Sequence, residues 1–139
     1  MPFDWREYVA VARHLQMYLG VEMTQEAALR TAIGRAYYAA FGYALWYATN
    51  FLDFRPRSRA EERTQDHGRL RAHLRDRRRA HVADKLHKLR QWRNLCDYDD
   101  TDRPGARLVP NVAEAMAATD YVIRALPPPT PPSTQPVGS

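Results

Sequence analysis

A single cysteine, Cys96, stands in the chain of 139 residues, so no internal disulfide can form. The longest uncharged apolar stretch, residues 36–48, is too short and too rich in tyrosine to span a bilayer. The N-terminus carries charges at Asp4, Arg6 and Glu7, where a secretory signal would need an apolar run. These absences predict a soluble, cytoplasmic protein in a reducing compartment, with no membrane partner.

Motifs for phosphate-cradling loops and for metal centres are missing as well. The six glycines are scattered and form no glycine-rich loop. None of the five histidines stands three or four residues from another, the spacing that places two metal ligands on one helix face. We therefore predict no metal site and no cofactor.

Positive charge, in contrast, is plentiful and unevenly placed. The chain has a net charge of +5, but residues 55–93 alone carry +9, so the remainder is net acidic. A basic block of this kind attracts phosphates by releasing counterions. The same pattern also fits the solvated face of a helical protein. We predict that the block contacts RNA through four arginines, Arg75, Arg77, Arg78 and Arg79.

Apolar residues recur at helical spacing along most of the chain, and nothing reads as a pair of strands. The pattern predicts an all-α fold with one domain over residues 1–126. Asp4 and Thr24 stand where helix N-caps are expected. Pro110 is expected in the first turn of the last helix. The predicted helices cover residues 4–19, 24–52, 66–76, 78–98 and 110–126. Residues 127–139, which hold six prolines, predict a flexible, disordered tail.

The second predicted helix is the most apolar segment. Small residues alternate there with large aromatic ones between Ala36 and Ala48. Small residues let a neighbouring backbone approach, and aromatic side chains fill the space beside it. We expect this helix to be the centre of the bundle.

Arg93 falls on the apolar face of the fourth predicted helix, four residues after Leu89 and three before Cys96. A guanidinium on this face needs acceptors, and Asp97 one turn further along is able to supply one. Helical geometry alone favours a structural clamp between Arg93 and Asp97. A contact with a partner chain is the alternative.

Two segments resemble signature motifs of HEPN domains. Residues 35–41, RAYYAAF, resemble the motif on that family's long second helix. Residues 93–98, RNLCDY, are similar to the Arg-Asn-x-x-Asp-Tyr form of its later motif. His67, between the two, matches a histidine that is commonly seen there. The helix order agrees over residues 3–126.

The resemblance implies an antiparallel four- to five-helix bundle of HEPN type that forms a homodimer. Active HEPN proteins are metal-independent endoribonucleases of toxin–antitoxin and defence systems, and a frequent partner is a nucleotidyltransferase that acts as antitoxin. In them, an arginine stabilises the transition-state phosphate, and a histidine that follows it moves the proton. The site residues that the resemblance carries to this chain are Arg93, Asn94, Asp97 and Tyr98.

The chain departs from the motif at the histidine, since Tyr98, Asp99 and Asp100 occupy the three positions allowed for it. His67 is the residue that could approach from a neighbouring helix instead. Three functions follow as hypotheses. The first is a HEPN-like protein that binds RNA, a nucleotide or a partner protein without catalysis. The second is a HEPN endoribonuclease that uses Arg93 in a dimer cleft. The third is a helical interaction module with no role in nucleic-acid biology.

Overall fold

The computed structural model describes residues 4–17, 24–57, 66–98 and 105–129, and gives only the backbone of residues 25, 96–98 and 105–111. These ranges contain five helices and no strand, so the all-α prediction is confirmed. The helices are α1 (Arg6–Gln16), α2 (Gln25–Phe51), α3 (Asp66–Asp76), α4 (Ala80–Tyr98) and α5 (Gly105–Ala125).

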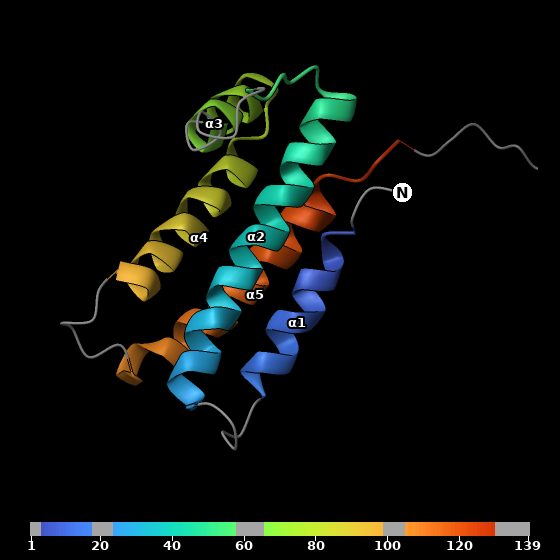
Figure 1. Ribbon diagram of the computed structural model, residues 1–139. Coiled ribbons are helices and arrows are strands. Elements are labelled where there is room, and N and C mark those ends of the chain that lie inside the picture. Colours follow the sequence, from blue (N-terminus) through green and yellow to red (C-terminus); the bar gives the residue numbers. More distant parts are fainter. Residues whose placement is uncertain (1–3, 18–23, 58–65, 99–104, 130–139) are drawn as a thin grey trace, which may run out of the picture.

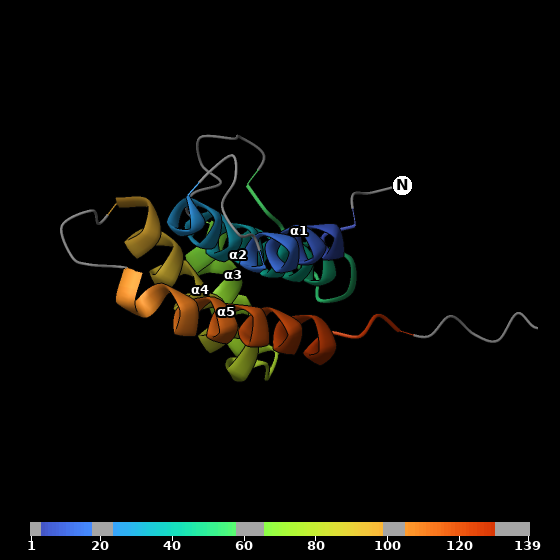
Figure 2. The same ribbon diagram turned by 90° about the horizontal axis from the view of Figure 1, so that it is seen from below.

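Helix α2 is the centre of the bundle, as its apolar character predicts, because it contacts all four other helices. It runs antiparallel to α1 and α4 and parallel to α5 (Figure 1). Seen from below, α1 and α2 lie along one side of the molecule and α5 lies along the other (Figure 2). The shorter α3 packs on α4 and on α2. None of the described helices is both long and apolar enough to cross a membrane.

The start and the packing of α2 follow from its sequence. The Thr24 side chain accepts the backbone N–H of Ala27 at 3.1 Å, which confirms the predicted cap. Alanines on the faces of α2 are fully buried, so neighbouring helices approach its backbone closely. Gly42 is the extreme case, because a Cβ atom there would overlap the ring of Trp5, the residue directly before α1.

Two buried hydroxyl groups join α5 to α2. The Thr119 hydroxyl donates to the carbonyl oxygen of Ala36 at 3.0 Å. The Tyr43 hydroxyl donates to the carbonyl oxygen of Leu126, just after α5, at 2.7 Å. Each pairs a polar group that burial would otherwise penalise. The two bonds fix the position of α5 along the axis of α2. Apolar contacts alone would define this position less sharply.

The turn between α3 and α4 has the hydrogen bonds of a Schellman cap. The N–H of Arg79 bonds the carbonyl of Leu74 at 2.8 Å, and the N–H of Arg78 bonds that of Arg75 at 3.0 Å. Arg78 takes a left-handed conformation, with φ 63°, at the position where glycine is usual. The turn sets the angle between α3 and α4. It also places the four arginines predicted to contact RNA, Arg75, Arg77, Arg78 and Arg79, at one end of the bundle.

The predicted helix ends differ from the structure at both ends of α1 and at the starts of α4 and α5. Helix α1 ends at Gln16, three residues before its predicted end at residue 19. Helix α5 begins at Gly105, so the prediction that Pro110 lies in its first turn is wrong. Ala106, Arg107 and Leu108, which precede the proline, are good helix formers, and they extend the helix on the N-terminal side of Pro110. Helix α4 begins at Ala80, because residues 77–79 form the cap of α3. The residue directly before α1 is Trp5, although Asp4 still accepts the backbone N–H of Arg6 at 3.0 Å.

Residues 127–129 of the predicted tail follow α5 without helical structure and are exposed. The rest of the tail, residues 130–139, lies outside the described ranges.

Candidate nucleic-acid interface

Arg93 lines a surface hollow between α2 and α4, with a volume of about 210 Å³. Successive turns of α2 supply the other walls, because residues four apart lie above one another on a helix. Gly34 leaves space at the centre, since no other atom lies within 4 Å of where its Cβ would be. We call this site the Arg93 hollow and define it by Arg30, Thr31, Gly34, Arg35, Tyr38 and Arg93.

The Arg93 guanidinium rests on aromatic rings of α2. Its central carbon lies 5.0 Å from the ring centre of Tyr38 and 5.4 Å from that of Tyr37. Cation–π contacts of this kind hold a guanidinium in place while its N–H groups can still bind an acceptor. The inward position of Arg93 agrees with the prediction from its place on the apolar face, and Arg93 is half-buried.

Two further arginines stand beside it. Arg30 pairs with Glu26, one turn away on α2, at 3.1 Å. Arg35 lies over the ring of Tyr8 on α1, at 5.2 Å from its centre. Three guanidinium groups thus line one small hollow, and none of the described residues lining it is acidic. Glu26 offsets the charge of Arg30, so the described arginines leave an excess of positive charge at Arg35 and Arg93. The exposed ring of Tyr38 stands beside them.

Only one other residue of the predicted catalytic set has a described side chain. Asn94 is exposed and does not line the hollow. Asp97 and Tyr98 lie on the last turn of α4, and their side chains are outside the part of the chain that the structure describes. Arg30 and Tyr38 were missed as site residues, because a sequence does not show which face of α2 meets α4.

His67 is not placed to act on a ligand in the hollow. It is only 3% exposed, stacks on Phe41 and shares a hydrogen bond with the Tyr37 hydroxyl through Nδ1 at 3.1 Å. Burial, followed by the charges of Arg90 and Arg71, lowers its pKa to about 3. Burial likewise raises the pKa of Tyr37. His67 is therefore a neutral core residue near pH 7 and not an exposed proton donor.

The predicted RNA-binding block is partly occupied by contacts within the chain. Arg75 pairs with Asp84 at 2.8 Å, and Arg77 lies 3.6 Å from the carboxylate of Asp53. Arg79 donates to the carbonyl of Arg77 and lies over the ring of Tyr47. The Arg78 side chain is exposed. Two of the four arginines thus have an acidic partner within the chain, whereas Arg78 and Arg79 have none among the described residues.

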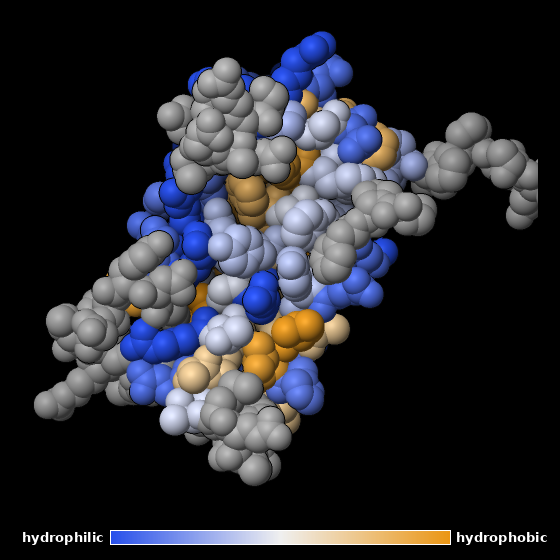
Figure 3. Space-filling model, viewed as in Figure 1, coloured by the Kyte–Doolittle hydropathy of each residue, from blue (hydrophilic) through white to orange (hydrophobic). Residues whose placement is uncertain are grey.

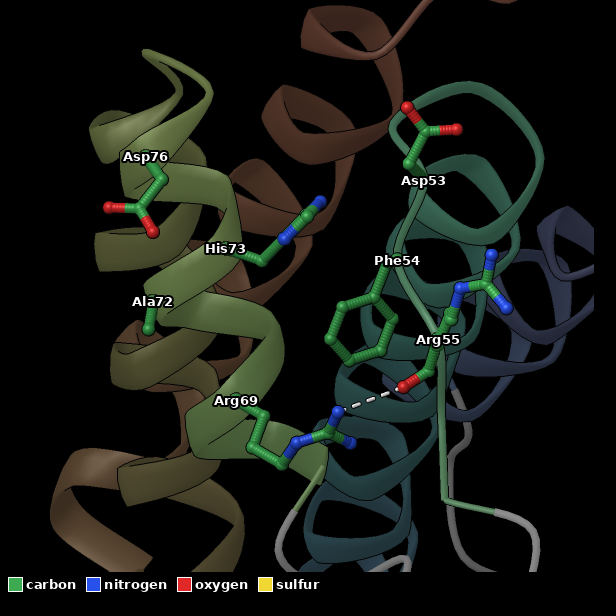
Figure 4. A pocket seen from close by; sticks show the side chains of 7 residues that line it. All are labelled: Asp53, Phe54, Arg55, Arg69, Ala72, His73 and Asp76. Carbon is green, nitrogen blue, oxygen red and sulfur yellow. Dashed lines mark hydrogen bonds between the residues drawn. The ribbon is translucent and has the colours of Figure 1, made fainter.

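A larger hollow of about 410 Å³ lies between α3 and the segment after α2 (Figure 4). One of its two arginines is used for structure, because Arg69 bonds the Arg55 carbonyl at 2.9 Å and the buried Asp66 carboxylate at 2.7 Å. Asp53 and Asp76 also line it. Acids and bases in similar number make it a weaker site for an anion than the Arg93 hollow.

Strongly hydrophilic side chains lie among pale aromatic and small ones over α2 and α4 (Figure 3). Within the described residues, no three His, Cys, Asp or Glu side chains gather as metal ligands would. Comparisons with family models, with curated proteins and with solved structures find no match to this chain.

Proposed function

We propose that this protein is a HEPN-like RNA-binding protein that holds the phosphate backbone of single-stranded RNA in the Arg93 hollow without cleaving it. The observation that carries the proposal is the convergence of Arg30, Arg35 and Arg93 on one hollow that has no acidic residue among its described walls. Guanidinium groups are the donors best suited to phosphate oxygens, because they present paired N–H groups in a fixed plane.

The ring of Tyr38 supports RNA over a simple inorganic anion. It is 38% exposed and stands in the same hollow as the three arginines. Unstacked bases of single-stranded RNA stack on exposed aromatic rings, whereas paired bases of a duplex are not available for this. The hollow therefore offers contacts for both a phosphate and a neighbouring base.

Binding without cleavage follows from the absence of a suitable proton donor among the described residues of the hollow. Transfer of a proton to or from the ribose needs a group whose pKa lies near neutral pH. The pKa of arginine lies far above it. His67, the alternative donor, is buried and neutral. A toxin–antitoxin or defence setting, with a nucleotidyltransferase-type antitoxin as partner, stays a prediction from the HEPN resemblance.

The test is the salt dependence of binding to a mixed-sequence, single-stranded RNA, followed by fluorescence anisotropy. Affinity for wild type should fall steeply between about 50 and 200 mM salt. Arg93→Gln should bind more weakly, and its log–log salt slope should be smaller by about 0.7, the contribution of one phosphate contact on a single strand. Arg13→Gln is the matched control, because Arg13 is an exposed arginine of α1 that pairs with Asp120.

An unchanged slope for Arg93→Gln would contradict the proposal. A slope that instead flattens when Arg75, Arg77, Arg78 and Arg79 are changed together to Gln would assign the RNA surface to the basic block. The same mixtures, kept in chelator and run on a denaturing gel, should contain intact RNA. Cleavage by wild type but not by Arg93→Gln would establish the endoribonuclease in place of the binding protein.

A further inference from the structure

Two buried nitrogen atoms of α3 have no hydrogen-bond partner among the described residues. They are Nε2 of His67 and Nε of Arg71. The two residues stand four apart on α3, so their side chains leave the same face of that helix. A buried polar atom has lost its contacts with water and normally bonds another group instead. Two such atoms one helical turn apart indicate that this face of α3 binds a group from outside the described chain.

The neighbouring helix adds a further cation to this face. Helix α3 packs on α4 (Figure 1), where His87 and Arg90 stand one turn apart. Arg71 Nη1 donates to His87 Nδ1 at 2.8 Å, because a guanidinium has no acceptor. Burial is the main cause of the low pKa of His67, and the charges of Arg90 and Arg71 come next, so both guanidinium groups lie near its ring. We call His67, Arg71, His87 and Arg90 the α3–α4 cation cluster.

The two guanidinium groups of the cluster have no acidic partner among the described residues. The two aspartates closest to the cluster in sequence, Asp66 and Asp84, each pair with another arginine of α3, at 2.7 and 2.8 Å. Arg71 and Arg90 are both half-buried, so water screens their charges only in part. Their position at the edge of the core still lets an ion reach them from solvent. Two positive charges without an acid are neutralised best by one anion of charge −2.

His67 supplies a third donor. A neutral imidazole has one N–H, and Nδ1 of His67 shares a hydrogen bond with the Tyr37 hydroxyl at 3.1 Å. When that hydroxyl donates to Nδ1, the N–H of the ring is on Nε2, the nitrogen without a partner. The cluster then offers three kinds of donor: Nε2–H of His67, Nε–H of Arg71 and the guanidinium of Arg90. An oxoanion accepts several such bonds at once, and bonds between charged groups are the stronger ones.

We propose that the α3–α4 cation cluster binds one free oxoanion of charge −2, such as sulfate or hydrogen phosphate, which accepts hydrogen bonds from His67, Arg71 and Arg90. Because these donors come from two helices, the ion joins α3 to α4. A free ion is favoured over the phosphate group of a larger molecule, since His67 is only 3% exposed and leaves no room for a substituent. The proposal does not depend on RNA binding in the Arg93 hollow, because the two sites share no residue.

The experiment is a calorimetric titration of the intact protein with sodium sulfate and, separately, with sodium phosphate, at constant ionic strength in a buffer free of both ions. One equivalent of either ion should bind. Chloride should bind at least about tenfold more weakly, because it carries half the charge. Arg71→Gln and Arg90→Gln should each weaken sulfate binding about tenfold or more, the usual loss for one hydrogen bond to a charged group. Circular dichroism checks that both variants keep the helix content of wild type.

The N–H of His67 provides a second measurement, which a purely structural role of the two arginines would not change. In ¹⁵N-labelled wild type, the Nε2 resonance of His67 should have the chemical shift of a protonated nitrogen once sulfate is bound. The resonance should move during the titration with the affinity that calorimetry gives. An Nε2 that stays unprotonated in saturating sulfate would contradict the proposed bond.

Two control variants separate this site from its surroundings. Arg78→Gln removes an exposed arginine from the turn between α3 and α4, and Arg93→Gln changes the Arg93 hollow. Both remove one positive charge, as the test variants do, but neither residue belongs to the cluster. Neither change should alter the affinity for sulfate, whatever the outcome of the RNA experiment.

Three results of the titration would overturn the proposal. No stoichiometric binding of sulfate or phosphate at millimolar concentration would make water the partner of the two buried nitrogens. Sulfate binding that is unchanged in both Arg71→Gln and Arg90→Gln would show an adventitious ion only, held elsewhere on the protein. Phenyl phosphate that binds as tightly as inorganic phosphate, and more weakly to Arg71→Gln, would make the phosphate group of a larger molecule the ligand.

Discussion

Arg78 holds a backbone conformation that costs an arginine about 1 kcal/mol and a glycine almost nothing. Its exposed side chain is not needed for the Schellman hydrogen bonds, which use backbone atoms only. Arg78→Gly should therefore raise the free energy of unfolding by about 1 kcal/mol, measured by urea denaturation. Arg78→Ala is the control that removes the same charge but keeps the Cβ atom, and it should give no such gain. Equal effects of both changes would assign the gain to charge.

His67 should make the protein sensitive to acid. Its pKa is about 3 in the folded chain and near 6.5 when unfolded, so between these values the unfolded chain binds a proton that the folded chain does not. Stability from this group is complete above about pH 6.5 and is lost as pH falls toward 3. The loss is at most about 1.4 kcal/mol per pH unit.

The comparison that isolates this contribution is His67→Gln, an uncharged variant whose amide can still bond the Tyr37 hydroxyl. At pH 7 the variant should be less stable than wild type, because the packing on Phe41 is lost. The difference in free energy of unfolding should shrink as the pH is lowered to 4. Only wild type has a histidine that stays neutral when folded and binds a proton when unfolded, so only wild type loses stability from this group. Parallel stability curves in urea over this range would show that His67 does not titrate as its burial implies.

At the scale of helices, two glycines of α2, Gly42 and Gly34, should respond in opposite ways to substitution by alanine. Gly42→Ala would push a methyl group into the Trp5 ring, so it should lower the free energy of unfolding by about 1–3 kcal/mol despite the better helix propensity of alanine. Gly34→Ala meets open space and should raise stability by up to about 1 kcal/mol. Thermal and urea denaturation of both variants check this. A destabilised Gly34→Ala would show that the hollow is more tightly packed.

The same scale shows what the sequence predicts well. Helix α3 has the bounds that its pattern predicts, and α2 begins at its predicted cap, because both depend on contacts within one or two turns. The start of α5 is predicted less well, because Pro110 indicates a first turn more strongly than the helix formers before it indicate a helix. The pairs Arg75–Asp84 and Arg77–Asp53 are not visible in the sequence, since a turn and a connecting segment bring these residues together.

For the whole molecule, the pattern predicts that Arg93 faces inward but not what it meets there. Tyr37 and Tyr38 belong to a predicted motif, yet their contact with Arg93 depends on how α2 and α4 are rotated against each other. The hollow between α4 and α5, which Trp92, Glu114 and Tyr121 line, was not predicted for the same reason. Its residues are unremarkable on either helix, and only the antiparallel register of the two helices gathers them.

The predicted homodimer can be tested through the charge of the Arg93 hollow. If two copies met across it, three arginines of each would approach three of the other. Two unit charges about 8 Å apart repel by about 2 kcal/mol at an effective dielectric constant of 20. Glu26 offsets the charge of Arg30 only, so an anion between the copies should favour a dimer formed through this face, and RNA should promote it.

Sedimentation velocity at several protein concentrations, with and without a short single-stranded RNA, measures this. The dimer fraction of wild type should rise when RNA is added. Arg93→Gln should show a smaller rise, whereas Arg13→Gln, the exposed control, should show the same rise as wild type. A dimer that forms equally well without RNA, and that Arg93→Gln does not change, would place the interface on another face. The exposed apolar side chains of Val11 on α1 and of Met17 just after it, 43% and 76% exposed, would then be the first surface to change.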